Sequence, residues 1–228
     1  VVIENNSIKS YKPFNKIKAR PCVFEYIYFA RPDSLLNGVC AYEYRKRLGV
    51  ELSKENKIEA DMVVPVPDSG VPAAIGFSQT SGIKFELGLI RNHYVGRTFI
   101  EPTQNIRSFG VKLKLSSTKS ILKNKSVILI DDSLVRGTTC SKIISLLYKA
   151  GVKKVHVKIA CPEIKFPDFY GVDMPTKKEL LSSNKDINEI CKYLGADSVN
   201  FLSLDGLYKA LINEKRNNNY PQFSDHYF

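Results

Sequence analysis

The sequence predicts an α/β fold with a mostly parallel sheet and helices on both faces. Two apolar runs, Met62–Val66 and Val127–Ile130, have the uninterrupted hydrophobic pattern of strands that are buried on both sides. The second run is followed by a helical pattern over about 139–150 and a strand pattern over 154–160, which together form one βαβ unit. A length of 228 residues fits one large domain, or one domain with extensions.

Shorter patterns predict the elements that precede this unit. The segment Phe24–Phe29 is rich in aromatic residues and predicts a strand near the core, with packing as its main role. Apolar residues recur at helical spacing from Tyr42 to Leu52, which indicates an amphipathic helix. After the first apolar strand, the turn Pro67–Gly70 leads into a second helix, expected from about Pro72.

The stretch from Arg91 to Gly110 has no clear periodicity and is rich in Arg, Thr, Asn and Gly. A loop of this length inside a compact domain is typically a lid or a disordered segment. We therefore expect a flexible loop there, which would exclude water from a reactive site when it closes.

The segment after the strand Val127–Ile130 carries groups that suit a sugar phosphate. Backbone N–H groups of Arg136–Thr139, two threonine hydroxyls and the positive end of a helix dipole suit the phosphate. Asp131 and Asp132 are poor phosphate ligands, but carboxylates suit the hydroxyls of a ribose or a hydrated magnesium ion. A strand end followed by a capped helix would explain the same residues structurally, but their ordered combination favours a binding site.

The turn Pro67-Asp68-Ser69-Gly70 is expected at the same edge of the sheet, because it also closes a parallel strand. Successive N–H groups in a tight turn at a helix start form a nest for an anion. Turns of this composition are common, so a purely structural role is the alternative.

Composition argues against several classes of protein. The net charge is +11, from 34 basic and 23 acidic residues, but the lysines are spread over the whole chain. This pattern indicates a solvated surface, and nucleic-acid binding is not expected without a basic stripe or a recognised module. No apolar run approaches the ~20 residues that span a bilayer, and no signal peptide is visible, so no membrane association is expected. Five scattered cysteines without a Cys-x-x-Cys pair indicate free thiols and a cytoplasmic location.

The segment Asp131–Thr139 resembles the phosphoribosyl-pyrophosphate (PRPP) motif of type I phosphoribosyltransferases. Four further stretches resemble one family in particular, the glutamine PRPP amidotransferases, and they occur in the family's order. Salvage phosphoribosyltransferases do not share the elements Arg31–Ser34 and Arg97–Ile100, which makes the resemblance specific. The four stretches are Phe24–Ser34, Pro65–Gly70, Tyr94–Ile100 and Phe169–Asp173.

The resemblance implies a type I phosphoribosyltransferase fold and a reaction in which ammonia displaces pyrophosphate from C1 of PRPP. The product, 5-phosphoribosylamine, enters purine synthesis; purine nucleotides are the implied feedback ligands and a homo-oligomer the implied assembly. The implied pyrophosphate ligands are Asp68, Ser69 and Gly70. The implied PRPP ligands are Asp131, Asp132, Ser133, Val135, Arg136, Gly137, Thr138 and Thr139. The implied flexible loop contains Tyr94, Gly96, Arg97, Thr98, Phe99 and Ile100, and the implied catalytic residues are Arg97, Thr98, Asp131 and Asp132.

Magnesium is the cofactor that the resemblance implies, held by Ser69, Asp131 and Asp132, where it would neutralise the departing pyrophosphate. One branch of the family also carries a four-iron cluster on four cysteines, one of them at the position of Cys22. Asp168 stands at the second of these positions, and the C-terminal cysteine pair is missing. We therefore expect no iron–sulfur cluster.

Three parts are expected along the chain. By the resemblance, residues 1–20 are the connector that follows a glutaminase domain, residues 21–212 are the phosphoribosyltransferase domain, and residues 213–228 are a polar tether that is incomplete here. The family's glutaminase uses an N-terminal cysteine as its nucleophile, whereas this sequence starts with Val1 and is too short for both domains. We expect only the synthase half, which would use free ammonia at best and not glutamine, and which would be inactive if the two halves depend on each other.

Two alternatives share the PRPP motif. A salvage nucleobase phosphoribosyltransferase would have a base-binding hood in place of the stretches around Arg31 and Arg97. A non-catalytic PRPP-sensing regulator would use its positive charge on DNA and would need a helix-turn-helix segment, which the sequence does not show.

Overall fold

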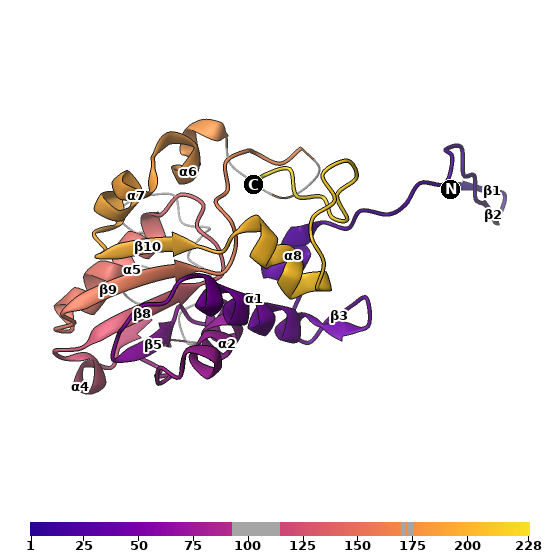
Figure 1. Cartoon of the computed structure of the whole chain (residues 1–228). Helices are drawn as coiled ribbons and strands as arrows, with labels where there is room; N and C mark the ends of the chain where they lie inside the picture. Colours follow the sequence, from indigo (N-terminus) through magenta and orange to yellow (C-terminus); the bar gives the residue numbers. More distant parts are fainter. Residues whose placement is uncertain (93–114, 170–171, 173–175) are drawn as a thin grey trace.

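The computed structural model describes residues 1–92, 115–169, 172 and 176–228. At its centre lies a parallel sheet of four strands, which are β5 (Met62–Pro65), β8 (Ser126–Asp131), β9 (Lys154–Ile159) and β10 (Ser198–Phe201). Their spatial order is β10-β9-β8-β5 (Figure 1). The side chains of Val127–Ile130 are fully buried, as the uninterrupted apolar run predicts for a strand covered on both faces.

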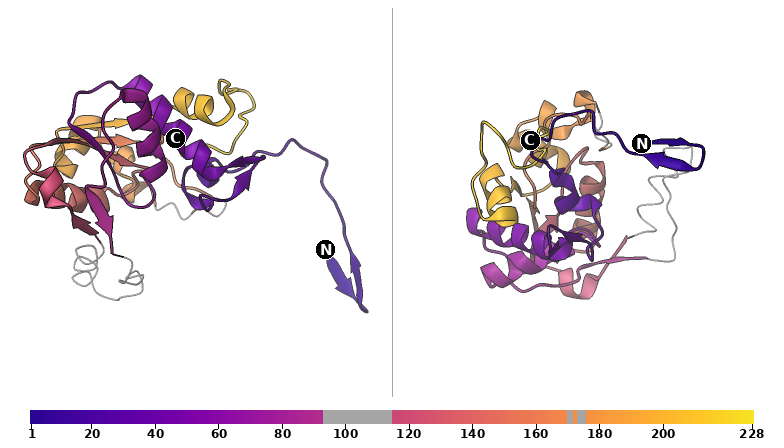
Figure 2. Two further views of the ribbon diagram at one scale, coloured as in Figure 1. Left: turned by 90° about the horizontal axis from the view of Figure 1, so that it is seen from below. Right: turned by 90° about the vertical axis from the view of Figure 1, so that its right-hand side faces the viewer.

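Helices cover both faces of this sheet, which confirms the predicted fold class (Figures 1 and 2). On one face, α1 (Ala41–Glu55) packs against α2 (Val71–Ser81) and α8 (Leu204–Ile212). On the other face, α5 (Thr138–Lys149) packs against α7 (Ile187–Leu194). The helices α1, α2 and α5 lie where the apolar spacing and the turn residues predict them.

Two glycines allow α1 and α2 to approach closely. A Cβ on Gly49 would lie 1.8 Å from the carbonyl oxygen of Ala73, and a Cβ on Gly76 would lie 2.0 Å from that of Lys46. Any larger residue at either position would force the two backbones apart. This contact therefore fixes the distance between the helices and the orientation of α2 on the sheet.

The connections that follow β5 and β8 lead to opposite sides of this strand pair, although the strands themselves are parallel. After β5 the chain passes through α2 to a parallel bridge between Phe85 and Val63, on one side of β5. After β8 it passes through α5 to β9, on the other side. In open α/β sheets, ligands bind beyond the carboxyl ends of the strands at such a switch point. The two predicted ligand loops follow these two strands, so the topology brings them together.

The remaining elements are short. The strands are β1 (Val2–Glu4), β2 (Ser7–Lys9), β3 (Leu35–Leu36), β4 (Val39–Cys40), β6 (Leu89–Arg91) and β7 (Leu115–Ser117). The helical turns are η1 (Glu25–Phe29), α4 (Lys119–Leu122), η3 (Lys177–Glu179) and α6 (Leu181–Asn184).

The predicted strand at Phe24–Phe29 is wrong, because Glu25–Phe29 form the π-helix η1. The buried guanidinium of Arg45 explains the difference. Its Nε donates to the carbonyl of Tyr26 at 3.1 Å, and its Nη2 donates to that of Ala30 at 2.7 Å. These donors satisfy carbonyl groups that a strand would present to a neighbouring strand. The predicted packing role is correct, since Tyr26 and Ile27 are buried.

Arg91, the first residue of the expected loop, is instead the last residue of a strand. This strand, β6, pairs with β7 in an antiparallel ladder, in which Leu89 lies opposite Ser117 and Arg91 lies opposite Leu115. The loop residues Tyr94, Gly96, Arg97, Thr98, Phe99 and Ile100 lie outside the described residues, as do the positions 170, 171 and 173–175.

The expected tether at residues 213–228 is wrong for its last part. Phe223 and Tyr227 are 2% and 0% exposed, and the Tyr227 ring meets that of Phe24 edge-on, with 5.2 Å between the centroids. The backbone of Ser224 pairs with the segment around Cys22, where its N–H donates to Pro21 at 2.9 Å. This segment therefore completes the core beside η1.

The first residues extend away from the body (Figure 1). β1 and β2 form a hairpin in which every residue is exposed, and an extended segment joins it to Pro21. Among the described helices, none is both long and apolar enough to cross a membrane.

Candidate functional site

The two predicted ligand loops meet at the carboxyl ends of β5 and β8. Ser69 follows β5, and its hydroxyl donates to Asp131 Oδ1 at 3.4 Å. The backbone N–H of Val66 donates to the carbonyl of Ile130 at 2.8 Å, which extends the strand pairing up to the loops. The structure therefore brings Ser69 together with the acidic pair.

The acidic pair combines burial with mutual repulsion. Asp132 is 7% exposed, and Asp131 Oδ1 accepts the backbone N–H of Asp132 at 2.9 Å. Burial, and then the charge of Asp132, raise the pKa of Asp131 well above its usual range. Burial also raises the pKa of Asp132, although hydrogen bonds from Ser133 and Ser69 and the charge of Arg45 oppose this shift. Two carboxylates in such surroundings favour a cation or hydroxyl donors as ligands.

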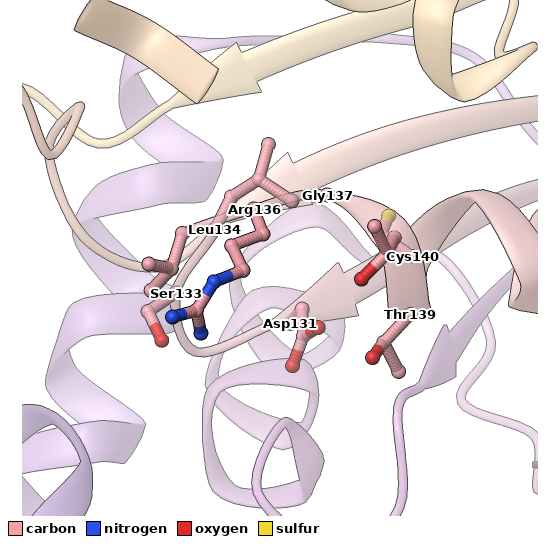
Figure 3. A pocket seen from close by; sticks show the side chains of 9 residues that line it. Asp131, Ser133, Leu134, Arg136, Gly137, Thr139 and Cys140 are labelled. Atoms are coloured by element: carbon pink, nitrogen blue, oxygen red, sulfur yellow. The ribbon is translucent and has the colours of Figure 1, made fainter. Parts of the chain in front are cut away.

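The loop after the acidic pair encloses a cavity of about 210 Å³ (Figure 3). Gly137 has a left-handed backbone with φ of 74° and immediately precedes α5. The cavity therefore sits at the N-terminal end of a twelve-residue helix, where free N–H groups and the helix dipole favour an anion. Its lining residues are Asp131, Ser133, Leu134, Val135, Arg136, Gly137, Thr138, Thr139 and Cys140.

Two features bear on the chemistry of this cavity. Burial raises the pKa of the Cys140 thiol, so this lining residue stays protonated at neutral pH and is a poor nucleophile. The guanidinium of Arg136 contacts Glu179, with 3.1 Å between Nε and Oε1. These features suit binding of a phosphate and do not suggest covalent catalysis.

The turn after β5 packs closely against the end of β8. A Cβ on Gly70 would lie 2.3 Å from the carbonyl oxygen of Ile130, so only glycine fits. The peptide bond between Pro67 and Asp68 is cis. Asp68 is half-exposed, and its carboxylate pairs with Arg91 at 2.8 Å.

The described donor set fits magnesium. Ser69, Asp131 and Asp132 offer only oxygen atoms, which Mg²⁺ prefers, and two carboxylates are typical where substrate phosphates supply further ligands. Among the described residues, no group of three or more His, Cys, Asp and Glu side chains could hold a metal ion.

The residues at the position of the family's iron–sulfur cluster form other contacts. The Cys22 thiol lies 3.2 Å from the Tyr227 hydroxyl, and Asp168 Oδ1 lies 2.9 Å from His226 Nε2. The absence of a cluster stays a prediction.

Three residues near the site were not predicted from the sequence. Arg45 underlies η1 and interacts with the charge of Asp132, Arg91 pairs with Asp68, and Glu179 pairs with Arg136. Local patterns do not reveal these contacts, because each one joins segments that are distant in the sequence. The predicted catalytic residues Arg97 and Thr98 lie outside the described residues, so their relation to the cavity stays a prediction.

Comparison with known proteins identifies the class to which this fold and site belong. The phosphoribosyl transferase domain family matches residues 45–192, which is more than half of the chain. The chain therefore belongs to this family.

The similarity extends further, to proteins named amidophosphoribosyltransferase. The protein of that name from Rhizobium etli is 55% identical over 97% of this chain and 45% of its own length. The Bacillus subtilis protein is 46% identical over 92% of this chain and 44% of its own length. The solved structure of the B. subtilis glutamine PRPP amidotransferase, complexed with ADP and GMP, superposes with a TM-score of 0.82 at 45% identity. The superposition covers 94% of this chain and 47% of the B. subtilis chain. This chain therefore spans about half the length of its relatives.

Proposed function

We propose that this chain carries the synthase reaction of an amidophosphoribosyltransferase, the committed step of purine synthesis. Ammonia would displace pyrophosphate from C1 of PRPP and give 5-phosphoribosylamine. The observation that carries the proposal is the contact between Ser69 and Asp131 beside the cavity at α5. This contact joins a loop suited to pyrophosphate with one suited to a sugar phosphate. The names of the relatives support the same reaction.

Each loop would bind one part of PRPP. The backbone of Arg136–Thr139 and the threonine hydroxyls would hold the 5′-phosphate at the start of α5. Asp131 and Asp132 would accept hydrogen bonds from the ribose hydroxyls, for which carboxylates are suitable acceptors. The turn Asp68–Gly70 would hold the pyrophosphate with the backbone N–H groups of Asp68 and Ser69, since that of Gly70 donates to the carbonyl of Val66 at 2.9 Å. Binding energy at both ends of the substrate would then fix C1 between the loops.

Magnesium belongs to this proposal, with Ser69, Asp131 and Asp132 as its protein ligands. When bound, it would neutralise charge on the pyrophosphate leaving group. The two carboxylates, whose pKa values are raised by burial in the free protein, would gain a counter-ion and stay ionised.

Further parts of the proposal rest on the resemblance. Arg97 and Thr98 would act from a loop that closes over PRPP and excludes water. In such an enzyme a glutaminase domain would release ammonia from glutamine, and the phosphoribosyltransferase domain would use that ammonia. Purine nucleotides would be feedback ligands of a cytoplasmic homo-oligomer, and the B. subtilis relative was solved with ADP and GMP.

The decisive test is pyrophosphate release from PRPP with Mg²⁺ and one acceptor at a time. We expect release with ammonium chloride, no release with glutamine, and none with adenine, guanine or hypoxanthine. An Asp131→Asn variant serves as the control for contaminating activity. Release that depends on a nucleobase would contradict the proposal and favour a salvage phosphoribosyltransferase. Specific DNA binding at physiological salt, without any release, would favour a PRPP-sensing regulator.

A further inference from the structure

A second segment contacts the outside of the phosphate loop, which is the loop of residues 133–137 before α5. This segment, residues 177–184, contains η3 and α6. The backbone N–H of Leu181 donates to the carbonyl of Val135 at 2.9 Å. The Leu181 side chain also packs over Gly137, where an added Cβ would lie only 2.7 Å from Leu181 Cδ2. The backbone of the phosphate loop is therefore held in place by residues about 45 positions later in the chain.

The same segment also holds the one cationic side chain of the loop. Arg136 Nε donates to Glu179 Oε1 at 3.1 Å. The other oxygen of this carboxylate accepts the hydroxyl of Thr176 at 3.3 Å, so the carboxylate is itself oriented. Because the pairing uses Nε, it leaves the two terminal amino groups of the guanidinium as donors for a phosphate.

This ion pair contributes little to folding stability. The side chains of Arg136 and Glu179 are 50% and 49% exposed, and such pairs are weakened by water and salt. Its effect lies in orientation, because a free arginine loses much rotamer freedom when it binds a ligand. An arginine that is already oriented loses less, so the ligand binds more tightly.

We propose that Glu179 is a positioning residue, which orients Arg136 so that the loop is preorganised for the 5′-phosphate of PRPP. The inference rests on the proposed function, since it assumes that PRPP is the ligand. Glu179 itself need not touch the substrate. The half-exposed carboxylate adds only a weak repulsion to the bound phosphate, because its charge is compensated by Arg136 and screened by solvent.

The test is calorimetric titration of the whole chain with two probes, PRPP with Mg²⁺ and ribose 5-phosphate. Ribose 5-phosphate retains the 5′-phosphate and lacks the pyrophosphate, so it isolates the phosphate loop. We expect Glu179→Gln to raise the Kd of both probes by about three- to tenfold. The matched control is Glu86→Gln. This substitution also removes a carboxylate from an ion pair, but its partner is Lys84, which lies outside the phosphate loop. Its Kd values should equal those of the wild type.

A double-mutant cycle separates positioning from a general structural effect. If Glu179 acts through Arg136, the variant Glu179→Gln/Arg136→Gln binds no more weakly than Arg136→Gln alone. Additive losses, or equal or tighter binding by Glu179→Gln, would overturn the inference. A wild-type chain that binds ribose 5-phosphate but not PRPP would instead overturn the proposed function, and the inference with it. Thermal unfolding of each variant confirms that the compared proteins are folded.

Discussion

The Ser69 hydroxyl donates to Asp131 Oδ1 at 3.4 Å, although 62 positions separate the two residues in the sequence. The contact links the turn after β5 to the acidic pair at the end of β8. The connections that follow these two strands lead to opposite sides of the pair. A ligand with a phosphate at each end would therefore meet both loops at once. Neither loop alone could fix the position of its central atoms.

Replacing Asp131 by asparagine should weaken PRPP binding by roughly 10- to 150-fold. The amide retains the shape of the side chain but loses its charge and one acceptor oxygen, and a hydrogen bond to a charged group contributes about 1.5–3 kcal/mol. Calorimetric titration with PRPP and Mg²⁺ measures the change. Asp61→Asn is the matched control, because Asp61 pairs with Lys125 near the first residues of β5 and β8, opposite the site. Equal losses in the two variants would refute the assignment.

The same Asp131→Asn substitution should stabilise the free protein, by about 0.5–2 kcal/mol at neutral pH. The raised pKa of Asp131 means that the folded state holds this proton more tightly than the unfolded chain does. The stability that comes from the protonated Asp131 side chain is therefore complete below pH 3.8. This stability is lost as the pH rises through the raised pKa of the folded state.

Urea unfolding in EDTA, between pH 4 and pH 8, measures this effect. The free energy of unfolding of Asp131→Asn should fall less with rising pH than that of the wild type. A variant that is less stable than the wild type at pH 7 would contradict the repulsion between Asp131 and Asp132.

Gly49→Ala should destabilise the protein by about 3 kcal/mol or more, because its Cβ would lie 1.8 Å from a backbone oxygen of α2. Gly195→Ala is a suitable control. Gly195 has a positive φ of 72° but open space around it, so this alanine costs only about 1–2 kcal/mol of backbone strain. Urea unfolding of both variants compares the two costs. If Gly49→Ala costs no more than the control, the close approach of α1 and α2 is not required.

The free energy of unfolding should increase as the pH rises above 8, because the buried Lys158 then loses its proton. This lysine of β9 is 1% exposed, and its ammonium donates to Asn200 Oδ1 at 2.7 Å. Burial lowers its pKa from 10.5 to about 8. Between these values the unfolded chain binds the extra proton, so the free energy of unfolding should rise by about 2 kcal/mol up to pH 9.5.

Lys158→Met should abolish this rise, whereas Lys154→Met, at an exposed position of the same strand, should retain it. Denaturant unfolding at pH 7, 8, 9 and 9.5 provides the comparison. Parallel pH profiles for the wild type and Lys158→Met would show that the buried lysine does not titrate in this range.

The parts of the fold that the sequence predicts well are those with a strong local pattern. β8 is a continuous apolar run, α5 has apolar residues at helical spacing, and the loop between them has a fixed order of acidic and small residues. Since parallel strands end at the same edge of a sheet, the meeting of Ser69 with Asp131 also follows from the pattern.

The parts that the sequence does not predict depend on distant partners. The aromatic segment at Glu25–Phe29 has the composition of a strand, but the buried guanidinium of Arg45 satisfies its carbonyl groups in a helical form. The asparagines at 217–219 give the C-terminal segment a polar composition, but Phe223 is buried beside the ring of Tyr26 and Tyr227 beside that of Phe24. Glu179 could not be associated with Arg136, because no spacing rule relates two loops 43 residues apart.

The bridge between Cys22 and Ser224 has a consequence for how the protein is made. The aromatic segment at Phe24 leaves the ribosome long before Tyr227, which covers Phe24 and lies 205 positions beyond Cys22. Until Phe223 and Tyr227 emerge, the surfaces of Phe24 and Tyr26 that they cover stay exposed and are available to chaperones. A translation product that stops before Phe223 should remain a substrate for quality control, even though its PRPP loop is already complete.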